Sequence, residues 1–255
     1  MPPSTLSLEK RGAIAHLALS RPERDNAIDA RTLRELADCC QSLAADDDVR
    51  AVILSAQGTV FSSGWDRTIL AGESPRAADI PGDAFACLAE LSRPVVCALN
   101  GDALSAGLEL ALVCDVRIAA EGARFGFPET AMGLIPMGGG SQRLPRLVGR
   151  GRALEMILTA EPIDAQEALA IGLVSAVVAG DALMAEAEAV AGRIAGQGPL
   201  AVRYAKEAIA RGLEMTLEQA LRYETDLTVI LQTTEDRAEG VRAFLEKRKP
   251  EFEGR

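Results

Sequence analysis

Histidine is nearly absent from this sequence, which contains a single one, His16, among 255 residues. Most nucleophilic hydrolases hold a histidine base beside the nucleophile. A chain with one histidine can belong to that class only if His16 is the base. His16 lies in an apolar, strand-like segment, residues 13–19, where we expect a structural role for its imidazole. General acid and base chemistry in this protein should therefore depend on carboxylates.

Aromatic residues and positive charge are also scarce. The chain has one Trp and two Tyr, too few for the stacking platforms that hold single-stranded nucleic acids. It carries 37 acidic against 27 basic residues, a net charge of −10. Nucleic acid and membrane surfaces are therefore not expected partners.

Long apolar runs and paired cysteines are missing as well. No uncharged apolar run reaches the ~18 residues that span a bilayer, and residues 1–12 lack the apolar core of a secretory signal. The five cysteines form no C-x-x-C pair, which predicts neither a metal site nor a disulfide framework (Cys39, Cys40, Cys87, Cys97 and Cys114). We therefore expect a protein of the reducing cytoplasm.

What is present is an alternation of strand-like and helix-like segments, which is typical of the α/β class. A helix is predicted from an Asp29 N-cap to about Ala45, and the pattern turns wholly helical after about residue 181. The strand-like segments are residues 13–19, 51–55, 94–99, 116–119 and 173–177.

A first candidate carboxylate, Glu109, follows the third of the strand-like segments just given. An Asn100-Gly101 turn and a helix that begins near Ser105 place helix N-terminal amides at a strand end, where they can stabilise a developing oxyanion. Glu109 lies three residues after Ala106 in the same apolar helix, so its carboxyl either has a raised pKa or finds a specific partner. Taken alone, a structural ion pair explains Glu109 as well as catalysis does.

A second candidate, Glu129, follows Pro128 and precedes three consecutive glycines at 138–140. These glycines lack both the Lys-Ser/Thr of a phosphate-binding loop and a preceding G-x-G-x-x-G, so no nucleotide-binding fold is predicted. Glu129 alone is compatible with an ordinary first-turn helix residue. With Glu109 it forms a candidate acid/base pair.

The region around these two glutamates resembles the signature region of the crotonase (enoyl-CoA hydratase/isomerase) family. That region reads NGDALSAGLELALVCDVRIAAEGARFGFPETAMGLIPMGGGSQRLPRLVG, and other blocks agree in order: RPERDNAID, VFSSGWD, LTAEPIDAQEALAIGLVSAVV and EDRAEGVRAFLEKRKPEF. The resemblance implies an α/β core of ββα units wound as a spiral, residues 1–195, and a C-terminal α-helical trimerisation region, residues 196–255. It also implies a cytoplasmic homotrimer or homohexamer.

The same resemblance implies a lyase of fatty acid metabolism. The expected activity is that of an enoyl-CoA hydratase, which adds water across the 2,3-double bond of an enoyl-CoA thioester, or catalyses the reverse dehydration. Glu109 and Glu129 would be catalytic, and the N–H groups of Trp65 and Ala106 would form the oxyanion hole. No metal and no separate cofactor are implied, because coenzyme A is part of the substrate.

Residues that bind coenzyme A are implied by the resemblance as well. They are Arg24, Ala27, Trp65, Asp66, Arg67, Thr68, Lys247 and Lys249, the two lysines coming from a neighbouring subunit. The chain departs from the family pattern at Trp65, Ser105 and Ala106, where small residues or glycines are common. Backbone donation survives these changes, but the Trp65 ring should reshape the pocket, and Gly-Trp-Asp at 64–66 resembles carnitinyl-CoA dehydratases.

Three alternatives remain at the level of sequence. An isomerase of the same family would need fewer acidic groups than the two glutamates. A serine acyl hydrolase could use Ser105, which lies in an A-x-S-x-G pattern, but the one histidine precedes the serine in a strand-like segment. A non-catalytic acyl-CoA-binding protein of this fold would be expected to have lost a glutamate.

Overall fold

The computed structural model describes residues 4–66 and 84–255, and its main layer is a six-stranded sheet. The strand order is β1-β2-β3-β4-β6-β9, with β1 and β2 antiparallel and the other neighbours parallel. A second, three-stranded sheet has the order β5-β7-β8. The strands are β1 (Leu6–Arg11), β2 (Ile14–Leu19), β3 (Ala51–Ala56), β4 (Val95–Leu99), β5 (Ala103–Leu104), β6 (Val116–Ala120), β7 (Arg124–Gly126), β8 (Ile163–Asp164) and β9 (Ala176–Val178).

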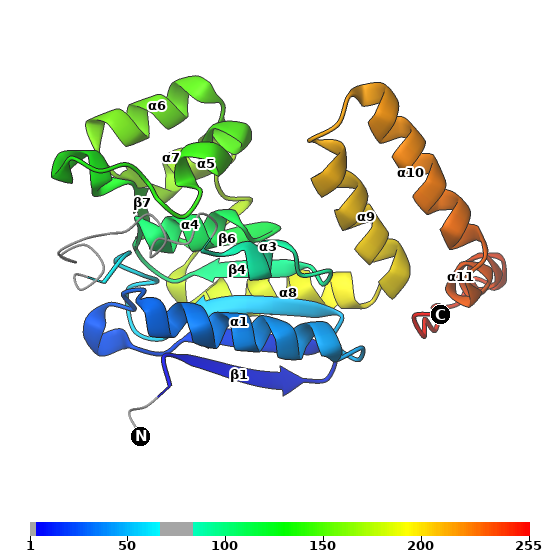
Figure 1. Ribbon diagram of the computed structural model, residues 1–255. Helices are drawn as coiled ribbons and strands as arrows, with labels where there is room; N and C mark the ends of the chain where they lie inside the picture. Colours follow the sequence, from blue (N-terminus) through cyan, green and yellow to red (C-terminus); the bar gives the residue numbers. More distant parts are fainter. Residues whose placement is uncertain (1–3, 67–83) are drawn as a thin grey trace.

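Helices cover the large sheet and extend beyond it (Figure 1). The α-helices are α1 (Ala30–Ala45), α3 (Ala86–Ala89), α4 (Ala106–Leu112), α5 (Gly140–Val148), α6 (Arg150–Thr159), α7 (Ala165–Ala170), α8 (Leu183–Ala195), α9 (Pro199–Gly212), α10 (Leu217–Gln232) and α11 (Glu235–Glu246). Short 3₁₀ turns occur at η1 (Pro22–Arg24), η2 (Pro128–Met132) and η3 (Gly180–Ala182). The predicted α/β class is confirmed.

The core has two parts because successive residues of a strand point to opposite faces. Ile53 of β3 packs with the α8 side chains, whereas its neighbours Val52 and Leu54 belong to the larger cluster on the other face of the sheet. Burial on both faces explains why β3 reads as a continuous apolar run and not as an alternating pattern. His16 pairs with Ile53 in register and therefore lies on the α8 face.

The chain repeats one unit: a strand of the large sheet, a short strand of the second sheet, then a helical segment. The sequence β4, β5, α4 is followed by β6, β7, η2, and β5 pairs in parallel with β7. This arrangement agrees with the expected ββα spiral. Because parallel strands end at the same edge of a sheet, the segments that follow β5 and β7 come together there.

The C-terminal segment is helical, as the sequence predicted. Helix α9 begins at Pro199, Thr216 caps α10 with a full capping box, and Thr234 caps α11. Figure 1 shows α9 and α10 standing away from the two sheets. An ion pair of 2.7 Å between Lys206 of α9 and Asp115 ties this region to the core.

Two strand predictions need correction. Strand β1 was not predicted, because only Leu6 of its six residues is buried and the others carry the polar signal of an exposed edge. The strand predicted at 173–177 is shifted: β9 is Ala176–Val178, and the apolar Leu173 and Val174 are buried in the turn that follows α7. Across residues 4–66 and 84–255, no helix is long and apolar enough to cross a membrane.

Candidate active site

Glu109 lies in α4, a helix whose seven residues are all buried. Its Oε1 atom accepts hydrogen bonds of 2.8 Å from the backbone N–H groups of Gly138 and Gly140. The two glycines allow this approach. A Cβ at 138 would lie 2.6 Å from Oε2 of Glu109, and a Cβ at 140 would lie 2.6 Å from the ring of Phe127. The glycine triplet is therefore a cradle for a carboxylate.

Burial raises the pKa of Glu109 to about 7, and the neighbouring Glu129 adds to the rise. The two backbone N–H donors and the Arg143 guanidinium oppose it. The Oε2 atom of Glu109 is buried without a hydrogen-bond partner among the described residues. Among the described residues Glu109 forms no ion pair, and a buried carboxyl with a raised pKa and one oxygen without a partner there is a candidate acid/base group.

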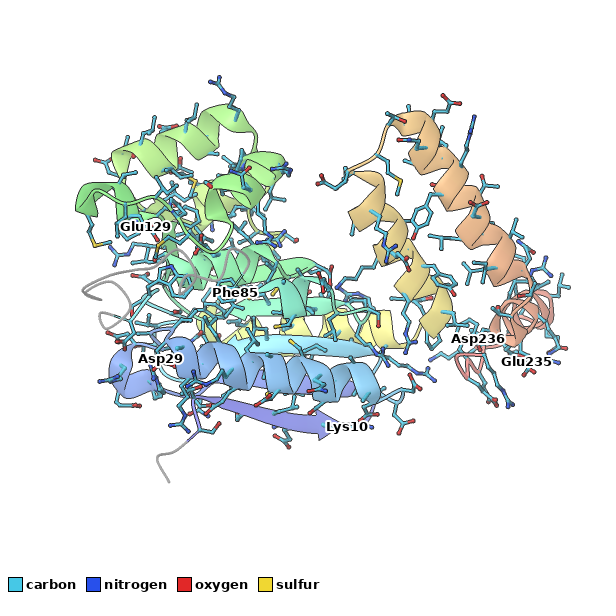
Figure 2. The ribbon with its side chains drawn as sticks, in the orientation of Figure 1. Lys10, Asp29, Phe85, Glu129, Glu235 and Asp236 are labelled. Carbon is cyan, nitrogen blue, oxygen red and sulfur yellow. The ribbon has the colours of Figure 1, made fainter. Side chains whose placement is uncertain are left out.

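Glu129 occupies the first turn of η2, directly after Pro128, and is fully buried. Neither of its carboxyl oxygens has a hydrogen-bond partner among the described residues. Burial raises the pKa of Glu129, and the nearby Ser105 hydroxyl opposes the rise. Figure 2 places Glu129 and Phe85 at the end of the molecule remote from Glu235 and Asp236.

Trp65 and Ala106 are the residues whose backbone N–H groups the family resemblance implied as an oxyanion hole. Ala106 is the first residue of α4, where an N–H has no partner within the helix. Ile28 pairs with the chain on either side of Trp65, through the Gly64 carbonyl at 2.7 Å and the Asp66 N–H at 2.8 Å. The Trp65 N–H therefore points away from Ile28.

Close packing brings the Trp65 and Ala106 segments together. Ser62 bridges to Ala103 of β5, and a Cβ at Gly64 would lie 2.3 Å from the Cβ of Ser105. Since Gly64 and Ser105 immediately precede Trp65 and Ala106, the backbone segments that carry the two N–H groups lie next to each other where β5 ends.

The Trp65 ring stacks on Phe85, with centroids 6.0 Å apart and an interplanar angle of 19°. Phe85 also borders the glycine cradle, since a Cβ at Gly138 would lie 3.0 Å from its ring. The Trp65 indole N–H is buried without a hydrogen-bond partner among residues 4–66 and 84–255. Trp65 and Phe85 therefore form an aromatic pair, and Phe85 lies next to the glycines that bind Glu109.

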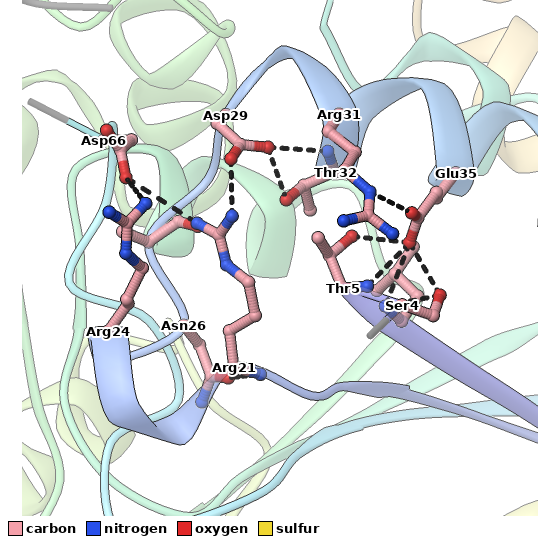
Figure 3. Close-up of polar contacts among 12 residues, drawn as sticks. Ser4, Thr5, Arg21, Arg24, Asn26, Asp29, Arg31, Thr32, Glu35 and Asp66 are labelled. Carbon is pink, nitrogen blue, oxygen red and sulfur yellow. Dashed lines mark hydrogen bonds and ion pairs between the residues drawn. The ribbon is translucent and has the colours of Figure 1, made fainter. Parts of the chain in front are cut away.

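Two of the predicted coenzyme A residues, Arg24 and Asp66, lie side by side (Figure 3). Arg24 in η1 lies 3.4 Å from Asp66, and the Ala27 carbonyl accepts a hydrogen bond of 2.6 Å from Arg21. The Ile28–Trp65 bridge joins the two segments. Arg67 and Thr68 lie outside the described residues.

Lys247 and Lys249 are not brought to this site within the chain. Lys247 caps the C-terminal end of α11, and Figure 1 shows α11 and the C-terminus remote from α4 and β7. Their contribution from a neighbouring subunit stays a prediction.

Two features of the site were missed from sequence. The glycine triplet was considered only as a phosphate loop, although glycine also permits a backbone to approach a carboxylate. Phe85 gave no signal, because an isolated phenylalanine before a short helix is indistinguishable from a core residue.

Comparison with known proteins shows that this chain is similar to proteins of one family. Residues 9–255 match the family model described as enoyl-CoA hydratase/isomerase. Among curated relatives, a crotonyl-CoA hydratase from Syntrophomonas wolfei is 40% identical, with 96% of each chain covered. A 2,3-dehydroadipyl-CoA hydratase from Escherichia coli is 38% identical over 99% of this chain and 100% of the relative. The crystal structure of an enoyl-CoA hydratase from Bacillus anthracis superposes with a TM-score of 0.95 at 38% identity, covering 98% of this chain and 100% of that one.

Proposed function

This chain belongs to the enoyl-CoA hydratase/isomerase family, and from that premise we propose the mechanism by which it adds water across the 2,3-double bond of an enoyl-CoA thioester. Relatives that match over nearly their full length are named as hydratases of enoyl-CoA thioesters, so the chain is an enzyme of the hydro-lyase class. The reaction needs a base for the water, a proton for the α-carbon, and donors for the enolate oxygen.

Glu109 and Glu129 supply the base and the acid. The pKa values of both carboxyls are raised, chiefly by burial, and the charge of Glu129 adds to the rise at Glu109, so one carboxyl can be protonated while the other is ionised. Glu109 is the base: its Oε1 is fixed by two backbone N–H groups, and its Oε2 is free to receive a proton from water. Glu129 is the acid that protonates the α-carbon.

The proton count closes over one turnover. Glu109 takes a proton from the water whose oxygen bonds to the β-carbon, and Glu129 gives its proton to the α-carbon. The proton gained by Glu109 then returns to Glu129, which is close enough to Glu109 to influence its pKa. Dehydration is the same sequence in reverse.

The N–H groups of Trp65 and Ala106 receive the thioester oxygen as it becomes an enolate. Two observations support this role: the first N–H of α4 has no partner within the helix, and the Trp65 N–H points away from Ile28. The Gly64–Ser105 contact holds the two backbone segments together.

Retention of two buried carboxylates favours hydration over the isomerase alternative, in which fewer acidic groups are needed. Ser105 as a hydrolase nucleophile lacks a histidine, since His16 lies on the α8 face of the large sheet.

Coenzyme A is bound as part of the substrate in this proposal, so hydration needs no separate cofactor and no metal. Arg24, Ala27, Trp65 and Asp66 form the part of its site that lies within the described residues, with Arg67 and Thr68 continuing along the chain. Lys247 and Lys249 approach it from a neighbouring subunit. The acyl preference, including any likeness to carnitinyl-CoA dehydratases, depends on the Trp65 ring.

The proposed assembly is a homotrimer or homohexamer, and the proposed location is the cytoplasm. Apolar side chains exposed on α9, α10 and α11 support the assembly, since an interface would remove them from water (Ile209, Leu217, Val229, Phe244 and Leu245). Cysteines that form no disulfide within residues 4–66 and 84–255 support a reducing compartment.

The observation that carries this proposal is the convergence of two fully buried glutamates with free oxygens at one edge of the second sheet. The test is hydration of crotonyl-CoA, measured as loss of its enoyl-thioester absorbance, in Glu109→Gln and Glu129→Gln. Each variant should lose about 10²–10⁴-fold in kcat, because the amide retains size but cannot transfer a proton. The double variant should lose less than the product of the single losses, since both groups serve one transition state.

A matched control is Glu161→Gln, which removes an exposed carboxylate and should retain wild-type activity. Near-wild-type hydration by Glu109→Gln together with an inactive Glu129→Gln would replace the hydratase mechanism with that of a single-base isomerase. Release of free thiol from the thioester would instead support a hydrolase.

A further inference from the structure

Ser105 has a backbone conformation that residues with a side chain rarely adopt. Its φ is 53° and its ψ is −128°, at the junction between β5 and α4. Glycine reaches this region without steric cost, whereas a Cβ makes it strained. A strained serine beside a candidate active site is a candidate for a functional role.

The fold holds Ser105 next to the segment that carries Glu129. The Ser105 N–H donates a hydrogen bond of 3.0 Å to the Gly126 carbonyl at the end of β7, and Glu129 follows three residues later in the chain. Leu104 pairs with Gly126 in register, so the two segments leave the second sheet side by side. Ser105 is only 5% exposed, so its hydroxyl has little access to solvent as a hydrogen-bond partner.

The hydroxyl is confined on its other side by Gly64. A Cβ at Gly64 would lie 2.8 Å from Oγ of Ser105, so the glycine provides the space that the serine side chain occupies. Neither carboxyl oxygen of Glu129 has a hydrogen-bond partner among the described residues, so the carboxyl can still accept one. The Ser105 hydroxyl is the side chain that opposes the rise in the pKa of Glu129.

We propose that Ser105 is a positioning residue for Glu129, whose carboxylate receives a hydrogen bond from the Ser105 hydroxyl as Glu129 gives its proton to the α-carbon. This inference rests on the proposed acid role of Glu129. A hydrogen bond to a carboxylate is stronger than one to a neutral carboxyl, so the bond tightens as the negative charge develops. An interaction that strengthens toward the transition state accelerates the chemical step, and the strained backbone keeps the hydroxyl in place for it.

Ser105→Ala and Ser105→Gly test the inference because they separate the hydroxyl from the strain. Both variants should lose about 10-fold in kcat for crotonyl-CoA, with KM changed less. Ser105→Gly should melt at or above the wild-type temperature, since glycine relieves the strain, so a loss of activity in that variant cannot come from unfolding. The alkaline limb of the kcat–pH profile should move to higher pH in both, because the hydroxyl favours the ionised form of Glu129. Glu109, the other titratable group acting at this site, is unchanged in both variants.

A double-mutant cycle shows whether Ser105 acts through Glu129. Ser105→Ala should add little to the loss already caused by Glu129→Gln. Ser62→Ala is the matched control: it removes a buried hydroxyl that donates to the Asn26 carbonyl near the same glycine, and should lower the melting temperature without moving the pH profile.

The inference is overturned if Ser105→Ala retains wild-type kcat and pH profile while Glu129→Gln is inactive, an outcome that leaves the proposed function intact. It is also overturned if the wild-type protein releases free thiol from crotonyl-CoA and Ser105→Ala does not, because Ser105 would then be a nucleophile. Full activity in Glu129→Gln would instead reject the proposed function itself.

Discussion

The backbone N–H of Gly140 donates a hydrogen bond of 2.8 Å to Oε1 of Glu109, although 31 residues separate them in the chain. The contact orients a buried carboxylate by means of groups that carry no net charge. One oxygen of Glu109 is thereby fixed, and the other has no hydrogen-bond partner among residues 4–66 and 84–255, which suits the proposed role of accepting a proton in a defined direction.

Gly140→Ala should disturb this contact directly. The added Cβ would lie 2.6 Å from the Phe127 ring and 3.0 Å from Oε1 of Glu109, so the backbone has to move and Glu109 with it. We expect a loss of about 10²-fold in kcat, the scale of effect known for small misplacements of catalytic groups. Gly151→Ala in α6, where a Cβ meets no atom within 4 Å, is the control and should be fully active. Equal activity of the two variants would show that the cradle does not position Glu109.

The raised pKa of Glu109 predicts a pH-dependent gain in stability for Glu109→Gln. The folded-state pKa of Glu109 is about 7, above its ordinary value of 4.5. Its contribution to the free energy of unfolding is therefore fully present below pH 4.5 and is lost as pH rises through 7. Glutamine retains an oxygen for the Gly138 and Gly140 donors and has no charge to bury. At pH 8 the variant should therefore be more stable than the wild type by on the order of 2–3 kcal/mol, with the difference vanishing near pH 4. Urea unfolding at the two pH values measures this, and a gain independent of pH would contradict the titration of Glu109.

Trp65 should control acyl preference more than turnover. Its backbone N–H is proposed for the oxyanion hole, while its ring stacks on Phe85 beside Glu109. Trp65→Ala should change the order of kcat/KM values across short, long and branched acyl-CoA substrates, and should lower stability by about 3–5 kcal/mol through the lost packing. Trp65→Phe keeps an aromatic ring against Phe85 and removes the unpartnered indole N–H, so it should be at least as stable as the wild type. A uniform loss across all substrates in the folded variants would argue against a role in selectivity.

The exposed apolar side chains of the C-terminal helices predict an oligomer. Leu213 and Phe244 are each 81% exposed in the isolated chain, and Leu217 is 75% exposed. Sedimentation velocity should show a trimer or hexamer at micromolar concentration, and Leu217→Glu or Phe244→Glu should shift the distribution toward smaller species. Ser141→Glu, on a polar part of α5, is a suitable control for the added charge. A wild-type protein that sediments only as a monomer would exclude the proposed assembly.

Local sequence was sufficient where a structure depends on neighbouring residues. Asp29 accepts from the Thr32 N–H as a helix N-cap, and Thr216 forms a capping box, because caps involve groups within one turn. The apolar helix around Glu109 also predicted a buried carboxylate. The edge strand β1 and the position of β9 were not predicted, since burial on a sheet depends on partners remote in the chain.

By itself, the sequence determined the α/β class, the reliance on carboxylates in a chain with one histidine, and the family to which the residues around Glu109 and Glu129 point. Only the tertiary structure decided that the glycine triplet holds Glu109, that Phe85 stacks on Trp65, and that Ser105 is strained beside Glu129. The reason is physical: these contacts join segments that meet only because β5 and β7 end at the same edge of one sheet, and their effect on pKa comes from burial, which no local pattern measures.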